Sequence, residues 1–486
     1  MNTILIYPQL EFSTAQVPVP PYSILFIADY LIKHNIEVDV FDLRFDNLSK
    51  VMDCIGEYEP QYIGISVMTG PQIYHALKVC EKVKKEFPKP KIVWGGIHST
   101  ILPTQTIQTD LIDVIVRGEG EKPYYELLSG KNINTIKGIT LKKNNKIHHN
   151  PSALLLSNIE LNNLSIPWEL VNAKRYIKNH NFNMITSRGC PLKCAFCYNT
   201  LFNNVWRGWT ADKCIQEIQK VIEFGATKIN FYDDNFFANS KRLPLLFKFL
   251  QENEIIWKAE IRVDRLNYSL AKDSKLHGCN QLYFGVESGS PRILKVLNKC
   301  ITVDEIINSA KITNKLRISA DYSWMIGIPS EKKEDIRSTI RLVKIIKKIN
   351  PDSEFTIKIL FPYPKTPIYK QAINLGFQPP KNLLVWANTR REQASNYLKN
   401  KNFLETISIT SAIMGKKVFE QKEMAALKLI RKFAEFRWKK EFFIFGFESF
   451  FFNLFRAQIE KQIAKNKEYE YDPFLRKLVK NKDRKS

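Results

Sequence analysis

Three cysteines lie close together in the middle of the chain, within the stretch SRGCPLKCAFCYN (187–199). They are Cys190, Cys194 and Cys197, and their spacing is C-x3-C-x2-C. A structural zinc site uses four protein ligands and a cubane iron–sulfur cluster normally uses four cysteines, so three thiolates leave one coordination position open. From the cysteines alone, an iron–sulfur cluster, a zinc ion and three unrelated thiols all remain open.

The residues around the cysteines distinguish between these three possibilities. Phe196 stands directly before the third cysteine, and the strand-like run FNMITSRG leads into the loop. The loop resembles the signature loop of the radical S-adenosylmethionine (radical SAM) enzymes. That resemblance implies a 4Fe-4S cluster whose free iron binds S-adenosylmethionine, and an external electron donor of the flavodoxin or ferredoxin type. It also implies radical chemistry, in which a 5′-deoxyadenosyl radical removes hydrogen from an unactivated carbon.

The composition limits the class of protein and its location. The chain has 486 residues, enough for two or three domains, and 44% of them are hydrophobic. The remaining cysteines are scattered singly, unlike a disulfide framework, and MNTILIYPQL does not read as a secretion signal. We therefore expect a cytoplasmic, reducing and anaerobic setting. The net charge of +24 is spread along the chain and no nucleic-acid-binding module is recognisable, so we expect no nucleic-acid partner.

Strand-like and helix-like segments alternate between residues 184 and 380, which predicts a series of βα units. The resemblance identifies them as a partial (β/α)6 barrel with its chemistry at the C-terminal ends of the strands. It also implies which strand-end residues bind S-adenosylmethionine: Tyr232, Asp233 and Asp234 its amino group, Arg262 its carboxylate, Glu287 and Ser288 its ribose or amino-acid part, and Gly327 its adenine. Neighbouring residues of a strand point to opposite faces, so the choice between Asp233 and Asp234 stays open.

The first 150 residues alternate in the same way and predict an α/β fold with a doubly wound parallel sheet. No G-x-G-x-x-G follows the first strand, so we expect no nicotinamide site. The order of an S-x-x strand end, a GG-x-H turn and a GEGE turn resembles the cobalamin-binding domain that precedes the barrel in one radical SAM subgroup. The resemblance implies a cobalamin site at the strand ends, lined by Ser66, Thr69, Gly70, Gly95, Gly96, His98, Gly118 and Glu119. A flavodoxin-like sheet that binds nothing is the alternative.

One turn departs from the pattern of the cobalamin mutases, which place a histidine below cobalt. Here the turn after the second strand reads VFDLRFDN and contains no histidine. We therefore expect no protein imidazole on cobalt, and a residue within 68–71 facing it.

The expected organisation is a Rossmann-like cobalamin-binding domain (1–150), a linker (151–183), the radical SAM core (184–380) and a helical C-terminal domain (381–486). The C-terminal domain contains the phenylalanine-rich stretch EFFIFGFESFFFNLF (441–455). It is shorter than the ~20 apolar residues that a membrane-spanning helix needs. We expect it to pack on the barrel, with peripheral membrane contact as the alternative.

The resemblance implies a cobalamin-dependent radical SAM enzyme, and we expect a methyltransferase that acts on an unactivated carbon. The first alternative uses the same cofactors for ring formation or oxidation, without methyl transfer, as the anaerobic cyclase of chlorophyll synthesis does. A tRNA methylthiotransferase is less favoured because the N-terminal region lacks that family's additional cysteine trio, and the intact trio argues against a non-catalytic corrinoid sensor. The substrate class stays open among small molecules, peptides, lipids and sugars.

Overall fold

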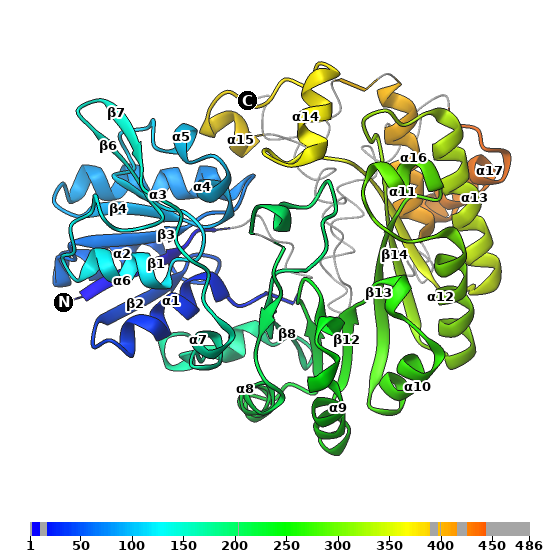
Figure 1. The fold of residues 1–486 in the computed structure, drawn as a ribbon, viewed down its shortest axis with the longest axis horizontal. Helices are drawn as coiled ribbons and strands as arrows, with labels where there is room; N and C mark the ends of the chain where they lie inside the picture. The colour runs from blue at the N-terminus through cyan, green and yellow to red at the C-terminus, as the bar shows by residue number, and fades with distance from the viewer. Residues whose placement is uncertain are drawn as a thin grey trace.

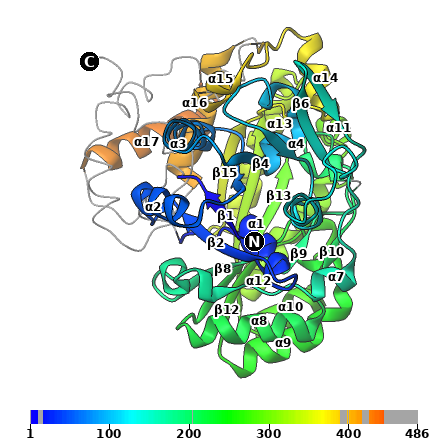
Figure 2. The same ribbon diagram turned by 90° about the vertical axis from the view of Figure 1, so that its left-hand side faces the viewer.

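A computed structural model describes residues 2–9, 17–202, 204–388, 397–398, 400–415 and 425–443. These residues form two sheets that stand side by side, one from the N-terminal third of the chain and one from its middle (Figure 1). The helices that follow the second sheet lie at its far edge and across the top of the molecule, as the turned view also shows (Figure 2).

The N-terminal sheet has the strand order β2-β1-β3-β4-β5-β6-β7, and its first five strands are parallel, as the sequence predicts. The strands are β1 (Asn2–Tyr7), β2 (Glu37–Asp42), β3 (Tyr62–Ser66), β4 (Lys91–Gly95), β5 (Val114–Val116), β6 (Ile139–Lys143) and β7 (Lys146–His149). The helices are α1 (Tyr22–Ile32), α2 (Leu48–Tyr58), α3 (Gln72–Glu86), α4 (Ile97–Ile101), α5 (Pro103–Thr106) and α6 (Glu121–Leu128). Helices α1 and α6 bury apolar side chains on one face, and α2 and α3 on the other.

The antiparallel hairpin of β6 and β7 was not expected from the sequence. Its turn is formed by Asn144 and Asn145, both with positive φ (49° and 58°). Asparagine tolerates this region, and two such residues between strands favour the turn type that matches strand twist. The Asn-Asn pair between KGITLKK and KIHH is the signal that predicts this hairpin.

The second sheet is an open barrel of six parallel strands in the order β15-β14-β13-β12-β11-β8, as the alternation predicts. The strands are β8 (Asn181–Met184), β11 (Lys228–Phe231), β12 (Ile256–Glu260), β13 (Cys279–Glu287), β14 (Ser319–Ile326) and β15 (Glu354–Ile359). The surrounding helices are α8 (Ala211–Glu223), α9 (Leu243–Glu252), α10 (Tyr268–Leu276), α11 (Pro291–Val296), α12 (Val303–Leu316) and α13 (Lys333–Ile349). A short ribbon of β9 (Ser187–Arg188) and β10 (Arg207–Gly208) follows β8.

The two faces of the barrel strands differ in polarity. On β12, Trp257 and Ala259 are fully buried against the surrounding helices, whereas Lys258 and Glu260 point the other way, into the barrel. Side chains alternate in this manner because successive residues of a strand face opposite sides. The interior of this barrel is therefore lined by polar and charged groups.

The expected linker spans 151–183; strand β8 begins at Asn181, and residues 151–180 pack against both sheets. Leu156 and Trp168 are buried in the same core as the barrel, and the Tyr176 hydroxyl donates to Asp42 Oδ2 at the end of β2 (3.0 Å). This stretch contains α7 (Asn158–Asn162) and two short 3-10 helices, η1 (Trp168–Leu170) and η2 (Ala173–Tyr176).

The C-terminal helices are α14 (Pro367–Asn374), α15 (Leu383–Asn388), α16 (Lys401–Gly415) and α17 (Ala425–Lys440). Helix α16 covers the edge of β15, where the Ser408 hydroxyl donates to Ile357 O (2.8 Å) and Ile357 N–H donates to Ser411 Oγ (3.0 Å). These bonds satisfy backbone groups that an open strand edge leaves unpaired. Most of the phenylalanine-rich stretch (444–455) lies outside the described residues, and no described helix is long and apolar enough to cross a membrane.

Candidate functional site

The cysteine loop leaves the barrel after β8 and turns sharply at a glycine. Gly189 has a φ of +79°, and a Cβ at this position would lie 2.3 Å from the carbonyl oxygen of Val205, so only glycine fits. Further along the loop, Ala195 N–H donates to the carbonyl of Leu297 (2.8 Å). The loop is therefore anchored both at its root and to the segment that follows α11.

The three predicted cluster ligands are free thiols brought together in this loop. Cys197 N–H donates to the carbonyl of Cys194 (3.1 Å). Burial is the main cause that raises the pKa of Cys194 above its ordinary value and that of Cys197 to about 11. Lys299 and Arg262 act to lower the pKa of Cys194, and charge on the neighbouring sulfurs acts to raise both. Buried thiolates so placed need a cationic partner, so the donor set fits an iron–sulfur cluster. Within the described part of the chain, these sulfurs do not meet at one point as ligands of a single metal ion would.

The two aspartates after β11 support the loop from different sides. Asp233 is buried, and its Oδ1 accepts hydrogen bonds from the backbone and the hydroxyl of Thr186 (3.1 and 2.9 Å). Asp234 is exposed, and its Oδ2 accepts from Gly189 N–H (3.1 Å). Of the predicted trio, Asp234 and the half-exposed Tyr232 therefore lie on the accessible side, and Asp233 lies behind it.

Arg262 follows β12 and presents an unused donor. Its Nε donates to Asp264 Oδ1 (2.8 Å), and its Nη2 donates to the carbonyl of Lys299 (2.8 Å). Its Nη1 is buried and has no hydrogen-bond partner. A buried donor without a partner is costly, and a carboxylate is the group that a guanidinium binds best. The geometry fits the predicted partner of the S-adenosylmethionine carboxylate.

Glu287 ends β13 at an irregularity in the ladder between Gly285 and Glu287, and it has a φ of +68°. Such backbone outliers are costly and concentrate at functional sites. Its Oε1 accepts from Lys299 Nζ (2.9 Å), and both side chains are largely buried. Ser288 is fully buried, and its Oγ lies 3.3 Å from Thr339 Oγ1 on α13. Ser288 therefore faces the outer helix, and Glu287 faces the barrel.

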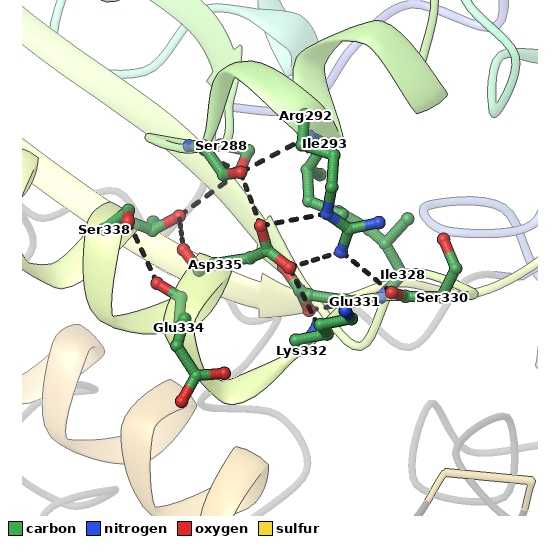
Figure 3. Close-up of polar contacts among 12 residues, drawn as sticks. Ser288, Arg292, Ile293, Ile328, Ser330, Glu331, Lys332, Glu334, Asp335 and Ser338 are labelled. Carbon is green, nitrogen blue, oxygen red and sulfur yellow. Dashed lines mark hydrogen bonds and ion pairs between the residues drawn. The ribbon is translucent and has the colours of Figure 1, made fainter.

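The loop after β14 is held by two carboxylates (Figure 3). Glu331 Oε2 accepts from the backbone N–H of Gly327 (2.6 Å) and of Ile328 (3.3 Å). Asp335 accepts from Ser290 Oγ (2.6 Å) and forms an ion pair with Arg292. Burial raises the pKa of Glu331 to about 8. The backbone of the predicted adenine site is thus shaped by contacts within its own turn.

The predicted cobalamin-binding turns lie at the C-terminal ends of β3, β4 and β5. Gly96 has a φ of +88°, and a Cβ there would lie 2.7 Å from the carbonyl oxygen of Val67, so this position needs glycine. A Cβ at Gly70 or Gly118 would meet nothing within 4 Å, and one at Gly95 would be in ordinary contact only. These turns therefore leave room for a ligand beside the strand ends.

His98 is the most enclosed residue of the predicted cobalamin group. Its Nδ1 lies 3.2 Å from Thr69 Oγ1, its Nε2 is buried without a partner, and its ring meets the ring of Trp386 edge-on. Burial lowers the pKa of His98 to about 4. Ser66 donates its hydroxyl to Ser23 on α1 (2.9 Å). Both Ser66 and His98 therefore contact neighbouring elements of the protein.

Glu119 has partners that the sequence did not reveal. It accepts from Arg207 Nη2 (2.8 Å) and from Arg188 Nη1 (3.1 Å), and Arg188 also pairs with Glu121 (2.7 Å). Both arginines belong to the β9–β10 ribbon beside the cysteine loop. The GEGE turn thus joins the N-terminal sheet to the root of that loop, and we call these four residues the interdomain ion-pair cluster.

The turn after β2, which lacks a histidine, is occupied by Asp42 and Arg44, which form an ion pair. At the end of β3, the Met68 side chain is 41% exposed. Its backbone N–H donates to Gln72 Oε1 (2.7 Å). Which residue faces cobalt stays a prediction, and Met68 is an exposed side chain within the predicted stretch.

Sequence reasoning missed several charged residues in and around the barrel, namely Arg188, Arg207, Glu260, Lys299 and Lys358. Glu260 had a readable signal, because it lies two positions before Arg262 and thus on the same face of the strand. The others are brought to the site by loops and by pairing across the fold, which no local spacing shows.

Two families match the chain, the B12 binding domain over residues 12–128 and the Radical SAM superfamily over residues 184–343. An uncharacterized methyltransferase of Pyrococcus horikoshii is 33% identical over 412 residues, which are 80% of this chain and 86% of that protein. The anaerobic magnesium-protoporphyrin IX monomethyl ester cyclase of Cereibacter sphaeroides is 24% identical, over 76% of this chain and 63% of the cyclase.

The fold has been seen in solved structures as well. The cobalamin-dependent S-adenosylmethionine radical enzyme OxsB, with aqua-cobalamin and S-adenosylmethionine bound, superimposes with a TM-score of 0.71 at 15% identity. The match covers 93% of this chain and 72% of OxsB. The order of a Rossmann-like sheet, a partial barrel and C-terminal helices is therefore shared with that enzyme.

Proposed function

Because the chain belongs to the radical SAM superfamily and carries a B12 binding domain, we propose that it is a cobalamin-dependent radical SAM methyltransferase acting on an unactivated carbon. The interdomain ion-pair cluster carries the proposal, because it places the cobalamin-type turns beside the root of the cysteine loop. A reaction that needs both cofactors at one substrate atom requires such proximity. The similarity to a methyltransferase over 86% of its length supports methyl transfer.

The proposed cofactors are a 4Fe-4S cluster, S-adenosylmethionine and cobalamin. When bound, the cluster and S-adenosylmethionine supply radical chemistry, and cobalamin supplies methyl transfer. The proposed partner of the S-adenosylmethionine carboxylate is Arg262, which the buried and unpartnered Nη1 supports, and the proposed partner of its ammonium is the exposed Asp234. The proposed cluster ligands are Cys190, Cys194 and Cys197. The proposed cobalamin contacts are Ser66, Thr69, Gly70, Gly95, Gly96, His98 and Gly118. The other proposed S-adenosylmethionine contacts are Tyr232, Glu287 and Gly327.

The domain organisation and setting are also proposals. We propose a cobalamin-binding unit over 1–150 and a radical SAM core over 184–380, joined by 151–183 and followed by C-terminal helices. A reducing, anaerobic cytoplasm and an electron donor of the flavodoxin or ferredoxin type suit a cluster with an open iron site.

Ring formation or oxidation without methyl transfer is the second candidate. The observation that favours it is the similarity to the anaerobic cyclase of Cereibacter sphaeroides across 76% of this chain. The two candidates share their cofactors and differ in the fate of S-adenosylmethionine.

The test follows the label in methyl-labelled S-adenosylmethionine during turnover with candidate substrates. A methyltransferase forms one S-adenosylhomocysteine for each 5′-deoxyadenosine and labels its product, whereas a cyclase or oxidase forms 5′-deoxyadenosine without matching S-adenosylhomocysteine. Cys190→Ala should abolish cleavage of S-adenosylmethionine, and Cys54→Ala, a half-buried thiol on α2, should not. Turnover with an unlabelled product would refute methyl transfer.

A further inference from the structure

Glu260 is an unpaired carboxylate inside the barrel. It ends β12 on the face that points into the barrel, and it is accessible to water although the barrel surrounds it on nearly all sides. It forms no hydrogen bond or ion pair with any residue that the structure describes. A carboxylate that faces the inside of the barrel and has no partner among the described residues is free to pair with a ligand that enters the barrel.

Two tyrosines flank Glu260 in the sheet. Glu260 pairs in register with Tyr283 on β13, and Ala259 pairs with Phe231 on β11. The next residue of β11, Tyr232, is therefore the neighbour of Glu260 on the other side. Tyr232 is 51% exposed. The row Tyr232–Glu260–Tyr283 thus places one carboxylate between two aromatic side chains.

Aromatic rings beside a carboxylate are a typical setting for an organic cation, because the ring face carries negative potential. The Tyr283 ring already forms one cation–π contact, because Lys258 Nζ lies 5.5 Å from the ring centre. Lys258 is two residues before Glu260 on the same face of β12 and forms the floor below it. A ligand at Glu260 therefore enters from the mouth of the barrel.

The charges around Glu260 also favour a cation. The groups that act on it are Asp234 after β11, Glu287 on β13, Lys299 after α11 and Lys358 on β15. Lys299 is engaged with Glu287 (2.9 Å). Burial is the main cause that raises the pKa of Glu260 to about 7; the charges of Asp234 and Glu287 act in the same direction, and those of Lys299 and Lys358 act against it. The net effect disfavours the charged form of this carboxylate, and a bound cation would offset it.

We propose that Tyr232, Glu260 and Tyr283 bind a cationic group of the substrate, an alkylammonium or guanidinium. This inference rests on the proposed function and names the class of its substrate. S-adenosylmethionine also carries cationic groups, but its proposed carboxylate partner, Arg262, lies two residues further toward the loop, about 6–7 Å along the strand. Glu260 is thus placed deeper in the barrel than Arg262, and Tyr232 borders both the cofactor and the proposed cation site.

The experiment compares n-pentylammonium with its neutral counterpart pentan-1-ol, by ligand-observed NMR on the anaerobically reconstituted full chain with S-adenosylmethionine bound. A charge-assisted bond should make the wild type prefer the ammonium by about tenfold or more. Glu260→Gln should remove this preference. The matched control Glu252→Gln, on the exposed outer helix α9, should keep it.

Two further measurements test whether Glu260 binds a cation of the substrate or a cationic group of S-adenosylmethionine. Binding of labelled S-adenosylmethionine and its cleavage without substrate should be unchanged in Glu260→Gln, which also shows that the variant is folded. Equal binding of amine and alcohol by the wild type would overturn the proposal, and so would a preference retained in Glu260→Gln. Loss of S-adenosylmethionine binding in Glu260→Gln would assign the carboxylate to the cofactor instead. Failure of the wild type to cleave S-adenosylmethionine would refute the proposed function alone, because the amine titration does not depend on turnover.

Discussion

Replacement of Glu119 by glutamine tests the interdomain ion-pair cluster directly. The variant keeps the size of the side chain and removes the charge that faces Arg188 and Arg207. Arg188 retains Glu121 as a partner (2.7 Å), whereas Arg207 retains only neutral acceptors, such as the carbonyl of Leu156 (2.6 Å). The main consequence is therefore an arginine charge that remains buried without compensation.

The structure sets the size of the effect. Removing one partner of a buried ion pair costs about 3–5 kcal/mol. The Arg207 side chain is 9% exposed, and its bond to Leu156 offsets part of the loss, so we expect about 3 kcal/mol. The control is Glu126→Gln, which removes a pair with Lys131 (2.7 Å) between largely exposed side chains. Pairs of that kind contribute less than about 1 kcal/mol.

The assay is urea unfolding of the full chain, followed by tryptophan fluorescence at several pH values. Burial acts to raise the pKa of Glu119, but Arg188 and Arg207 outweigh it, so the pKa lies below its ordinary value. The stabilisation is thus present above the unfolded pKa of about 4.3 and is lost as the pH falls through the lower folded value. The difference between wild type and Glu119→Gln should be full at pH 7 and should shrink below about pH 4. Equal effects of Glu119→Gln and Glu126→Gln at pH 7 would refute this account.

Three other substitutions test separate parts of the site. Gly96→Ala should destabilise the chain by about 1–3 kcal/mol, because φ is +88° and the added Cβ would meet the carbonyl oxygen of Val67. It should also weaken cobalamin binding in a spectral titration. An unchanged titration would exclude this turn from the cobalamin site. Asp233→Asn should lower the iron content after reconstitution, because the carboxylate accepts two hydrogen bonds from Thr186 at the base of the cysteine loop; normal iron content would contradict that role. The pKa of His98 is lowered to about 4 in the folded chain, so between about pH 4 and about pH 6.5 His98 is protonated only in the unfolded chain. The free energy of unfolding of the wild type should therefore decrease as the pH is lowered across this window, by up to about 1.4 kcal/mol per pH unit. His98→Gln should lack this slope, and the same pH profile in both proteins would argue against a buried neutral imidazole.

The N-terminal sheet could be predicted because its parallel strands are covered on both faces. Runs such as YIGIS and KIVWG are mostly apolar, as buried parallel strands require, and the helices between them show helical spacing. The barrel could be predicted from the alternation of strand-like and helix-like segments. The cysteine loop could be placed as well, since it follows the first strand of the second series and the structure confirms that order. Local patterns carry this information because they depend on neighbours in the chain.

The partners of Glu119 could not be predicted. Arg207 is 88 residues away, and the GEGE turn has the same letters whether it faces a cofactor or an arginine. Ser408 and Ser411 are a similar case, because hydroxyls on a largely buried helix give no sign in the sequence that they bond the edge of β15. Pairings of this kind depend on how elements meet in three dimensions.

The N-terminal sheet and its helices contact the barrel and the C-terminal helices in several places. The interdomain ion-pair cluster joins the GEGE turn to the β9–β10 ribbon. Near the bottom of the view in Figure 1, the stretch around α7 joins the N-terminal sheet to the barrel, and near the top, α15 packs on α3. There, Trp386 Nε1 donates to Gln105 Oε1 (2.6 Å), and the Gln105 amide donates to the carbonyl of Pro380 (3.1 Å). Between these places, the Tyr22 hydroxyl on α1 donates to the carbonyl of Asn183 on β8 (2.8 Å), within a buried core that α1 shares with the barrel strands. A swing of one sheet against the other would have to break buried contacts at each of these places, so the strand ends of the two sheets are held in one mutual orientation.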